Sequence, residues 1–207
     1  MNGKFIVFEG PDGSGKTTIL KNIYDRLTLE GYHIKTFREP GGTEISEKIR
    51  DIIIDNDNIK MSAKTESLLF AASRAQLVEE KIKPALVDGD IVLSDRFVLS
   101  SLTYQGIGRG LGINQIKSIN DFAIGGLTPD LTIFFNIDYK TALIRKRENF
   151  TADRLESEDF DFHKKIFDGY IDMAERYSDS IKVVDASQTI EKVTDDVYQI
   201  IKTKLED

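Results

Sequence analysis

The sequence predicts an α/β fold in which a five-stranded parallel sheet is flanked by helices. Five short apolar runs alternate with longer helical patterns along the 207 residues, as expected of βα units with right-handed crossovers. Several of these runs are continuously apolar rather than alternating, which is typical of strands covered on both faces. A glycine-rich loop joins the first apolar run to the first helical pattern, as a strand–loop–helix unit requires.

The expected strands are, in order, KFIVFE (4–9), HIKTF (33–37), DIVLS (90–94), LTIFFNI (131–137) and IKVVD (181–185). In the first helical pattern, apolar residues at positions 19, 20, 23 and 27 follow helical spacing, and Gly31 stands just past its end. The other helical patterns cover about 44–55, 64–87, 98–105, 114–125, 139–148, 158–178 and 189–206.

Composition limits the classes of protein that fit. The length, without a linker or repeat, predicts a single domain over residues 1–207. A net charge of -7 argues against binding nucleic acid or an anionic membrane through bulk charge. No cysteine is present, which excludes disulfide and thiolate chemistry. With neither a signal peptide nor an apolar run of about 20 residues, we expect a soluble cytoplasmic protein.

The glycine-rich loop fits the pattern G-x-x-x-x-G-K-[ST] of a phosphate-binding P-loop. Its glycines let backbone N–H groups surround an anion, and the following helix N-terminus adds partial positive charge. Lys16 is expected to reach the transferred phosphates, and the Thr17 hydroxyl to hold Mg²⁺. The expected ATP-binding residues are Gly10, Pro11, Asp12, Gly13, Ser14, Gly15, Lys16, Thr17 and Thr18.

Arginines follow two of the expected strands. Arg38 and Arg96 stand where open α/β sheets bind ligands, and Arg50 lies on the next helical pattern. An arginine can hold a phosphate through two parallel hydrogen bonds, so these side chains indicate a second phosphate site facing the first. The alternative for each arginine is an ordinary surface salt bridge.

Three further residues suggest ligand contacts. Phe70 and Arg74 lie four residues apart on one helical face, where they could stack on a base and donate to its carbonyl, although Phe70 alone is more typical of a core. Asp95 ends an apolar strand and could hold Mg²⁺ or its waters. An equally plausible role for Asp95 is to orient an arginine.

With these motifs in order, the chain resembles the thymidylate kinases of bacterial type, which are P-loop nucleoside monophosphate kinases. The resemblance runs nearly end to end and rests on EGPDGSGKTT, REPGGT, LLFAASRAQ, DRFVLSSLTYQG, GLTPDLTIFFNI and DRLESEDFDFHKKIFDGY. It implies a P-loop NTPase fold, a homodimer, and transfer of the γ-phosphate of ATP to dTMP, giving dTDP and ADP.

The resemblance also implies a role for each matching residue on the acceptor side. Arg38 and Arg96 would bind the dTMP phosphate, with Arg50 nearby. The thymine-side residues would be Phe70, which stacks on the base, Arg74, which donates to a carbonyl, and Ser101 and Gln105, which read the rest of the base edge. Tyr104 would crowd the sugar 2′ position, and DASQ (185–188) would lie beside adenine.

Asp12 is an acid inside a loop that surrounds negative charge. Because backbone N–H groups hold the ATP phosphates, a side chain on the rim of the loop is free to face the acceptor. The resemblance implies that Asp12 accepts a hydrogen bond from the sugar 3′-hydroxyl. The carboxylate could also orient an arginine such as Arg38; the alternative is a solvated turn residue.

The variable P-loop positions include no arginine, although some members of the family carry one there. The stretch IRKRENFTADRLE (144–156) offers Arg145, Lys146, Arg147 and Arg154 instead, and resembles a short lid, at about 145–157, that closes over ATP and excludes water. The alternative is a solvated basic helix end. We select Arg147 and Arg154, with Lys16 and Arg96, as the catalytic cations.

Two other functions are compatible with parts of the pattern. A kinase for UMP or CMP could use the same pyrimidine contacts, although Tyr104 favours a deoxyribose. A nucleotide-dependent switch would need the P-loop but no second substrate, which the arginines after two strands argue against.

Overall fold

The computed structural model describes residues 3–147, 153–155 and 157–206, with the side chains of all of these except 146 and 147. Its strands are β1 (Lys4–Glu9), β2 (Ile34–Arg38), β3 (Ile91–Asp95), β4 (Leu131–Asn136) and β5 (Ile181–Asp185). All pair in parallel in one sheet, in the order β2-β3-β1-β4-β5. The predicted five-stranded parallel sheet is confirmed.

The helices connect these strands and cover the sheet. They are α1 (Lys16–Leu29), α2 (Glu44–Ile54), α3 (Ala63–Leu77), α4 (Lys83–Val87), α5 (Val98–Ser101), α6 (Ile113–Ile124), α7 (Tyr139–Arg147), α8 (Phe160–Arg176) and α9 (Ile190–Glu206). A 3-10 turn, η1 (Asn56–Asn58), and two π-helical stretches, η2 (Val78–Ile82) and η3 (Leu102–Gly108), complete them.

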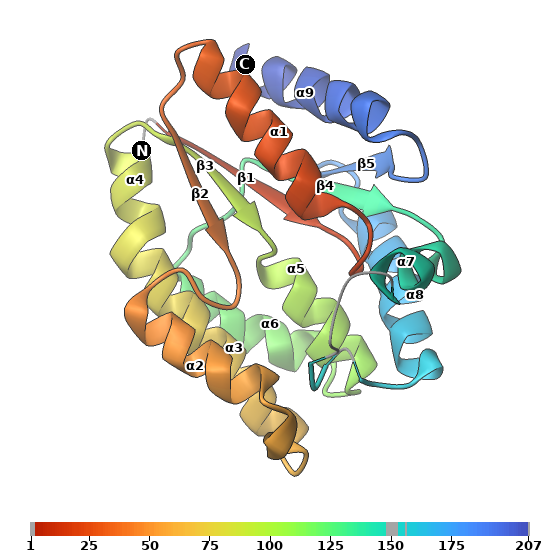
Figure 1. Ribbon diagram of the computed structural model, residues 1–207. Coiled ribbons are helices and arrows are strands. Elements are labelled where there is room, and N and C mark those ends of the chain that lie inside the picture. Colours follow the sequence, from red (N-terminus) through yellow and green to blue (C-terminus); the bar gives the residue numbers. More distant parts are fainter. Residues whose placement is uncertain (1–2, 148–152, 156, 207) are drawn as a thin grey trace.

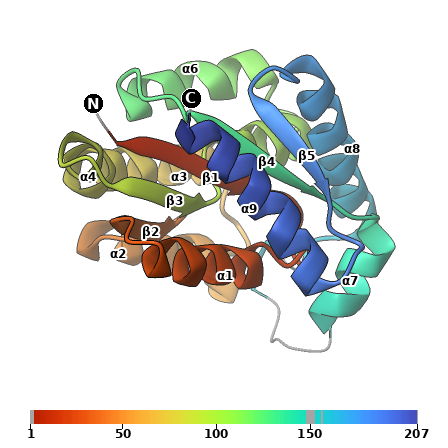
Figure 2. The same cartoon turned by 90° about the horizontal axis from the view of Figure 1, so that it is seen from above.

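The helices form a layer on each face of the sheet. Helices α1 and α9 lie side by side on one face (Figures 1 and 2), where Ile23 and Val197 pack with Phe135 of β4. On the other face, Leu77 at the end of α3 packs on Phe5 of β1. Because both faces are covered, β1 and β3 are apolar almost throughout, as their sequences predicted.

Two expected helices differ from the structure. The pattern at 64–87 is interrupted at η2, just before Pro84 in the first turn of α4. Since proline has no N–H to donate to the preceding turn, the wider π-helical turn accommodates it. The pattern at 98–105 continues as η3 to Gly108, so the first glycines of GIGRGLG (106–112) lie inside a helical stretch.

The carboxyl ends of β1, β2 and β3 meet at one edge of the sheet, where α/β proteins bind ligands. Glu9, Arg38 and Asp95 are the last residues of these strands, and the loop from residue 10 to residue 15 leads from β1 into α1. The functional groups below gather at this edge. Among the described helices, none has the length and apolarity that crossing a bilayer demands.

Candidate active site

The loop between β1 and α1 has the conformation that a P-loop requires. Gly13 and Gly15 have positive φ angles of 81° and 87°, which favour glycine strongly. A Cβ atom on Gly13 would lie 2.1 Å from the carbonyl oxygen of Ala142, so no larger residue fits there. Helix α1 begins at Lys16, and its N-terminal N–H groups therefore open onto the loop.

The Lys16 side chain is buried within this loop. Its ammonium group donates to the carbonyl oxygens of Gly10 and Pro11, each at 3.0 Å. Burial, together with the positive charge of Arg96, lowers the pKa of Lys16 to about 8. Both described hydrogen bonds of this ammonium group are to backbone carbonyls, and the nearby carboxylates of Asp95, Asp12 and Glu9 favour its charged form. A cation at this place in the loop is suited to binding phosphate.

Thr17 and Asp95 bring two oxygen ligands together beside the P-loop. The Thr17 hydroxyl donates to Oδ2 of Asp95 at 2.8 Å, linking the first turn of α1 to the end of β3. Mg²⁺ favours oxygen ligands and commonly binds through one or two protein groups, substrate phosphates and waters, so this pair fits the ion. No cluster of three or more His, Cys, Asp or Glu side chains suited to a metal occurs among the described residues.

Arg96 connects the P-loop to the neighbouring strand ends. Its backbone is left-handed, with φ 76°, an uncommon conformation for a residue other than glycine. The guanidinium forms an ion pair with Asp12 and donates to the carbonyl of Gly10 at 3.1 Å and to the Ser100 hydroxyl at 3.0 Å. The Tyr104 hydroxyl lies 3.4 Å from both members of the ion pair.

Glu9 was not anticipated from the sequence. Its carboxylate is fully buried and accepts hydrogen bonds from the N–H of Phe97 at 2.9 Å, the N–H of Ser100 at 3.1 Å and the Tyr170 hydroxyl at 3.0 Å. Burial raises the pKa of Glu9. These contacts hold the turn that carries Arg96. The sequence signal that could have pointed to Glu9 was an acidic residue at the end of an apolar strand.

A pocket opens beside the P-loop at this edge of the sheet, and Asp12 and Arg96 are among the residues that line it. The pocket therefore adjoins the place where a P-loop holds a terminal phosphate. The lining residues are Asp12, Glu39, Pro40, Arg50, Ile54, Phe70, Arg74, Arg96, Ser100, Ser101, Tyr104, Gln105, Asp153 and Leu155.

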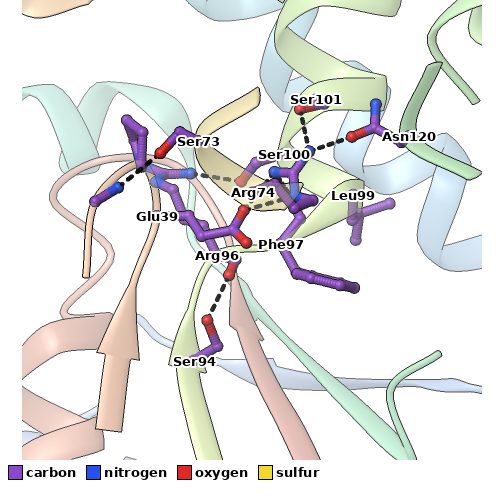
Figure 3. Close-up of polar contacts among 12 residues, drawn as sticks. Glu39, Ser73, Arg74, Ser94, Arg96, Phe97, Leu99, Ser100, Ser101 and Asn120 are labelled. Carbon is purple, nitrogen blue, oxygen red and sulfur yellow. Dashed lines mark hydrogen bonds and ion pairs between the residues drawn. The ribbon is translucent and has the colours of Figure 1, made fainter. Parts of the chain in front are cut away.

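Arg74 is almost fully buried in the wall of this pocket, with 1% of its surface exposed. Its Nε donates to Glu39 at 2.7 Å, NH1 donates to the Ser101 hydroxyl at 3.0 Å, and NH2 to the carbonyl of Phe97 at 2.9 Å. Figure 3 shows the guanidinium enclosed by these groups and by Asn120, to which it also donates. Burial raises the pKa of Glu39 to about 7 although Arg74 opposes the shift.

The remaining predicted base contacts line the same pocket. Phe70 is half-buried, while Ser101, Tyr104 and Gln105 are buried. The Gln105 amide donates to Glu66 at 3.0 Å. The structure thus brings together the residues predicted to face the acceptor base, and it adds Glu39 and Glu66, which the sequence did not single out.

Arg38 and Arg50, which were both predicted to lie near the acceptor phosphate, make different contacts. Both donate to the carbonyl of Pro40, at 2.7 and 3.1 Å. Arg38 also pairs with Glu47 at 2.8 Å, whereas Arg50 lines the pocket. Burial and the charge of Arg38 lower the pKa of Arg50, whereas Glu47, Asp153 and Asp51 oppose the shift.

The predicted lid, about 145–157, is only partly within the described residues. The Arg147 side chain lies outside them, as does that of Lys146. Arg145 donates to the carbonyl of Ala186, in the segment DASQ, at 3.0 Å. Arg154 is buried, donating to the carbonyl of Ile53 at 2.8 Å and pairing with Glu66 at 2.8 Å.

Comparison with known proteins gives a consistent set of relatives. The family model described as thymidylate kinase matches residues 8–197. The chain is 50% identical over 200 residues to a thymidylate kinase of Finegoldia magna, covering 97% of this chain and 98% of that protein. It is 51% identical over 209 residues to one of Lactobacillus helveticus, covering 99% and 98%. A crystal structure of thymidylate kinase from Ehrlichia chaffeensis superimposes with TM-score 0.80 at 29% identity, covering 98% of this chain and 100% of that one.

Proposed function

The chain belongs to the thymidylate kinase family and is a phosphotransferase, and from this premise we propose how its residues transfer the γ-phosphate of ATP to dTMP. One observation supports our assignment of ATP to the P-loop and of dTMP to the neighbouring pocket. Asp12 is part of the P-loop and also lines the neighbouring pocket, where it pairs with Arg96. A donor phosphate in the loop and an acceptor phosphate at Arg96 would therefore be adjacent.

On the donor side, the backbone of residues 10–18 and the Lys16 ammonium bind the ATP phosphates. Thr17 and Asp95 are the residues that would hold Mg²⁺, which would supply charge neutralisation at the phosphates when bound. The contact between their oxygens at 2.8 Å supports this assignment. On the adenine side, Arg145 and the DASQ segment are in contact, and we assign them to the base of ATP.

On the acceptor side, Arg96 binds the dTMP phosphate, with Arg50 and Arg38 contributing positive charge. Asp12 accepts from the sugar 3′-hydroxyl, and Tyr104 crowds the 2′ position. Phe70 stacks on thymine, and Arg74, Ser101 and Gln105 form the polar edge that reads it. All of these residues except Arg38 line one pocket, which supports the assignment.

The reaction needs no strong general base. An oxygen of the dTMP phosphate, whose second pKa is about 6, is already ionised near neutral pH. It forms a bond to the γ-phosphorus as the bond to the ADP oxygen breaks, so no proton is consumed. Catalysis then depends on positioning and on cations around the transferred group, for which we propose Lys16, Arg96, Arg147 and Arg154.

Alanine variants at the two lid positions separate their roles. A residue that touches the transferred phosphate should lower kcat with little change in the KM for dTMP. Because Arg154 pairs with Glu66 beside the acceptor pocket, a rise in that KM in Arg154→Ala would assign this residue to the pocket instead and leave Arg147 as the lid cation.

An assay of ADP release with Mg-ATP tests the proposed function, using dTMP, dUMP, dCMP, UMP, CMP, dGMP and no acceptor. A clear preference for dTMP is expected. Equal use of UMP or CMP would contradict the roles of Tyr104 and Arg74. ADP release that no acceptor increases would indicate a nucleotide-dependent switch.

We also propose that the protein is a homodimer that acts in the cytoplasm without nucleic acid. Helix α2 packs on α3, and α3 on α6. Apolar side chains remain exposed on these helices, with Phe122 of α6 exposed by 91%, Leu68 of α3 by 56% and Ile52 of α2 by 47%. A second copy covering this surface would remove apolar area from water. Light scattering should give the mass of a dimer, and Leu68→Glu should shift it toward a monomer.

A further inference from the structure

Glu66, on the first turns of α3, is a buried carboxylate at the meeting point of several segments. Its side chain is 1% exposed. Oε1 accepts from the Gln105 amide at 3.0 Å and from Nε of Arg109 at 3.2 Å. Oε2 accepts from NH2 of Arg109 at 2.9 Å and pairs with NH2 of Arg154 at 2.8 Å. Both oxygens are thus occupied by donors.

The surroundings of Glu66 keep it ionised. Burial alone would raise its pKa, but the hydrogen bonds from Arg109 and Gln105 outweigh burial and lower it. An ionised carboxylate can only accept hydrogen bonds. The group that Gln105 presents to Glu66 is therefore its NH₂ end, because the carbonyl end would place two acceptors together.

This contact determines the orientation of the Gln105 amide. A glutamine amide carries a donor on one side and an acceptor on the other, and the two ends can exchange by a rotation of the side chain. With Nε2 directed to Glu66, the carbonyl oxygen is directed away from it. Gln105 lines the pocket together with Phe70 and Arg74, so a base in this pocket meets an amide of one fixed polarity.

Pyrimidine bases differ in what they offer to such an amide. Thymine and uracil carry a hydrogen on N3 and donate there, whereas cytosine has an unprotonated N3 that accepts. A carbonyl oxygen from Gln105 would satisfy N3–H but would face a lone pair on cytosine. Leaving a buried polar group unpaired is costly and discriminates strongly between similar substrates.

We propose that Glu66 is a positioning residue for substrate specificity: by holding the Gln105 amide in one orientation, it makes the acceptor pocket select a pyrimidine with an N3–H group over cytosine. The inference rests on the proposed function, in which Gln105 reads the base.

The variant Glu66→Gln tests this role, because a neutral amide at position 66 can donate as well as accept and no longer dictates the orientation of Gln105. Values of kcat/KM are measured for dTMP, dUMP and dCMP. The dTMP-to-dCMP ratio should fall at least about tenfold in the variant, since one hydrogen bond to the base loses its polarity. The dTMP-to-dUMP ratio should stay unchanged, because both bases carry N3–H.

Glu158→Gln is the matched control. Glu158 pairs with the same Arg109 at 2.6 Å but has no described contact with Gln105, so the variant removes a carboxylate from the cluster without releasing the amide. Its dTMP-to-dCMP ratio should equal that of the wild type. An equal fall in both variants would overturn the proposal, because the effect would then arise from charge around Arg109.

A ratio of two kcat/KM values from one preparation is independent of the fraction of folded protein, so partial instability of Glu66→Gln does not obscure the result. If that variant is insoluble, Glu66→Asp keeps the charge but is shorter by one methylene, and the same fall is expected. In a Gln105→Leu background, replacing Glu66 should have no further effect on the ratio, because Glu66 acts through Gln105.

The outcomes distinguish this inference from the function on which it depends. A wild-type protein that uses none of the three acceptors contradicts the proposed function itself. A wild-type preference for dTMP whose ratio to dCMP is unchanged in Glu66→Gln overturns only the role of Glu66.

Discussion

Asp12 and Arg96 form an ion pair that joins the P-loop to the pocket beside it. The acid in the phosphate-binding loop therefore faces a cation that lines this pocket, with the Tyr104 hydroxyl 3.4 Å from each partner. Because Arg96 neutralises the negative charge of Asp12, this carboxylate need not oppose the binding of ATP. The same pair holds Arg96, whose backbone is left-handed, between the P-loop and this pocket, where we propose that the acceptor phosphate binds.

The first prediction follows from this pair. Asp12→Asn should reduce kcat/KM for dTMP about 10- to 100-fold, the range expected when a hydrogen bond to a charged group is lost, while ATP affinity changes little. Steady-state kinetics and calorimetric titration with ATP measure the two quantities. Arg96→Ala should abolish transfer and also retain ATP binding. Loss of ATP binding in either variant would show that the pair belongs to the donor site.

The second prediction concerns the pH dependence of ATP binding. Lys16 has a pKa of about 8 in the free protein because burial and Arg96 disfavour its charged form. ATP phosphates favour the charged form, so binding above that pKa requires uptake of a proton. Affinity should be constant at lower pH and fall by up to about tenfold per pH unit above pH 8.

Calorimetric titrations from pH 7 to pH 10 measure this dependence, and buffers with different ionisation enthalpies report the proton uptake directly. In Lys16→Met, the affinity should be low and nearly independent of pH over this range. A wild-type affinity that stays level up to pH 10 would contradict the role of Lys16 as the group that titrates.

The third prediction concerns the pair of oxygen ligands. Asp95→Asn removes the charge from the residue that accepts the Thr17 hydroxyl at 2.8 Å. The Mg²⁺ concentration that gives half-maximal activity should rise about tenfold, since carboxylates are preferred ligands of this ion. Titration of activity with Mg²⁺ at constant ATP measures the shift. An unchanged Mg²⁺ requirement would leave Asp95 as a residue that orients Thr17 only.

The sheet and the P-loop could be predicted because their signals are local. Continuous apolar runs are typical of strands buried on both faces, and the glycine spacing dictates the backbone of residues 10–15. The ends of β1 and β3 are neighbours in a parallel sheet, so Asp12 and Arg96, which follow them, could also be expected near one site.

The buried carboxylates could not be found in this way, because their partners are remote in the chain. Glu39 is 35 residues from Arg74, and Glu9 is 91 residues from Ser100. A glutamate in a sequence is usually solvated, and only the tertiary fold shows that these are enclosed. The π-helical stretches η2 and η3 depend equally on packing and carry no simple periodic signal.

The last prediction tests what the Glu39–Arg74 pair contributes to stability. Its side chains are 2% and 1% exposed, so removing one charge leaves the other buried without its counterion. Glu39→Gln should lower the free energy of unfolding by about 3 kcal/mol, near the lower end of the cost of breaking a buried pair, since the new amide oxygen still accepts from Arg74. Urea denaturation, monitored by circular dichroism, measures the change.

Asp25→Asn provides the matched comparison, because Asp25 pairs with Lys21 on α1 at 2.8 Å with side chains 51% and 75% exposed. That substitution should leave the urea midpoint nearly unchanged, since solvent screens exposed pairs. An equally small change in Glu39→Gln would show that the Glu39–Arg74 pair contributes no more to stability than an exposed pair does.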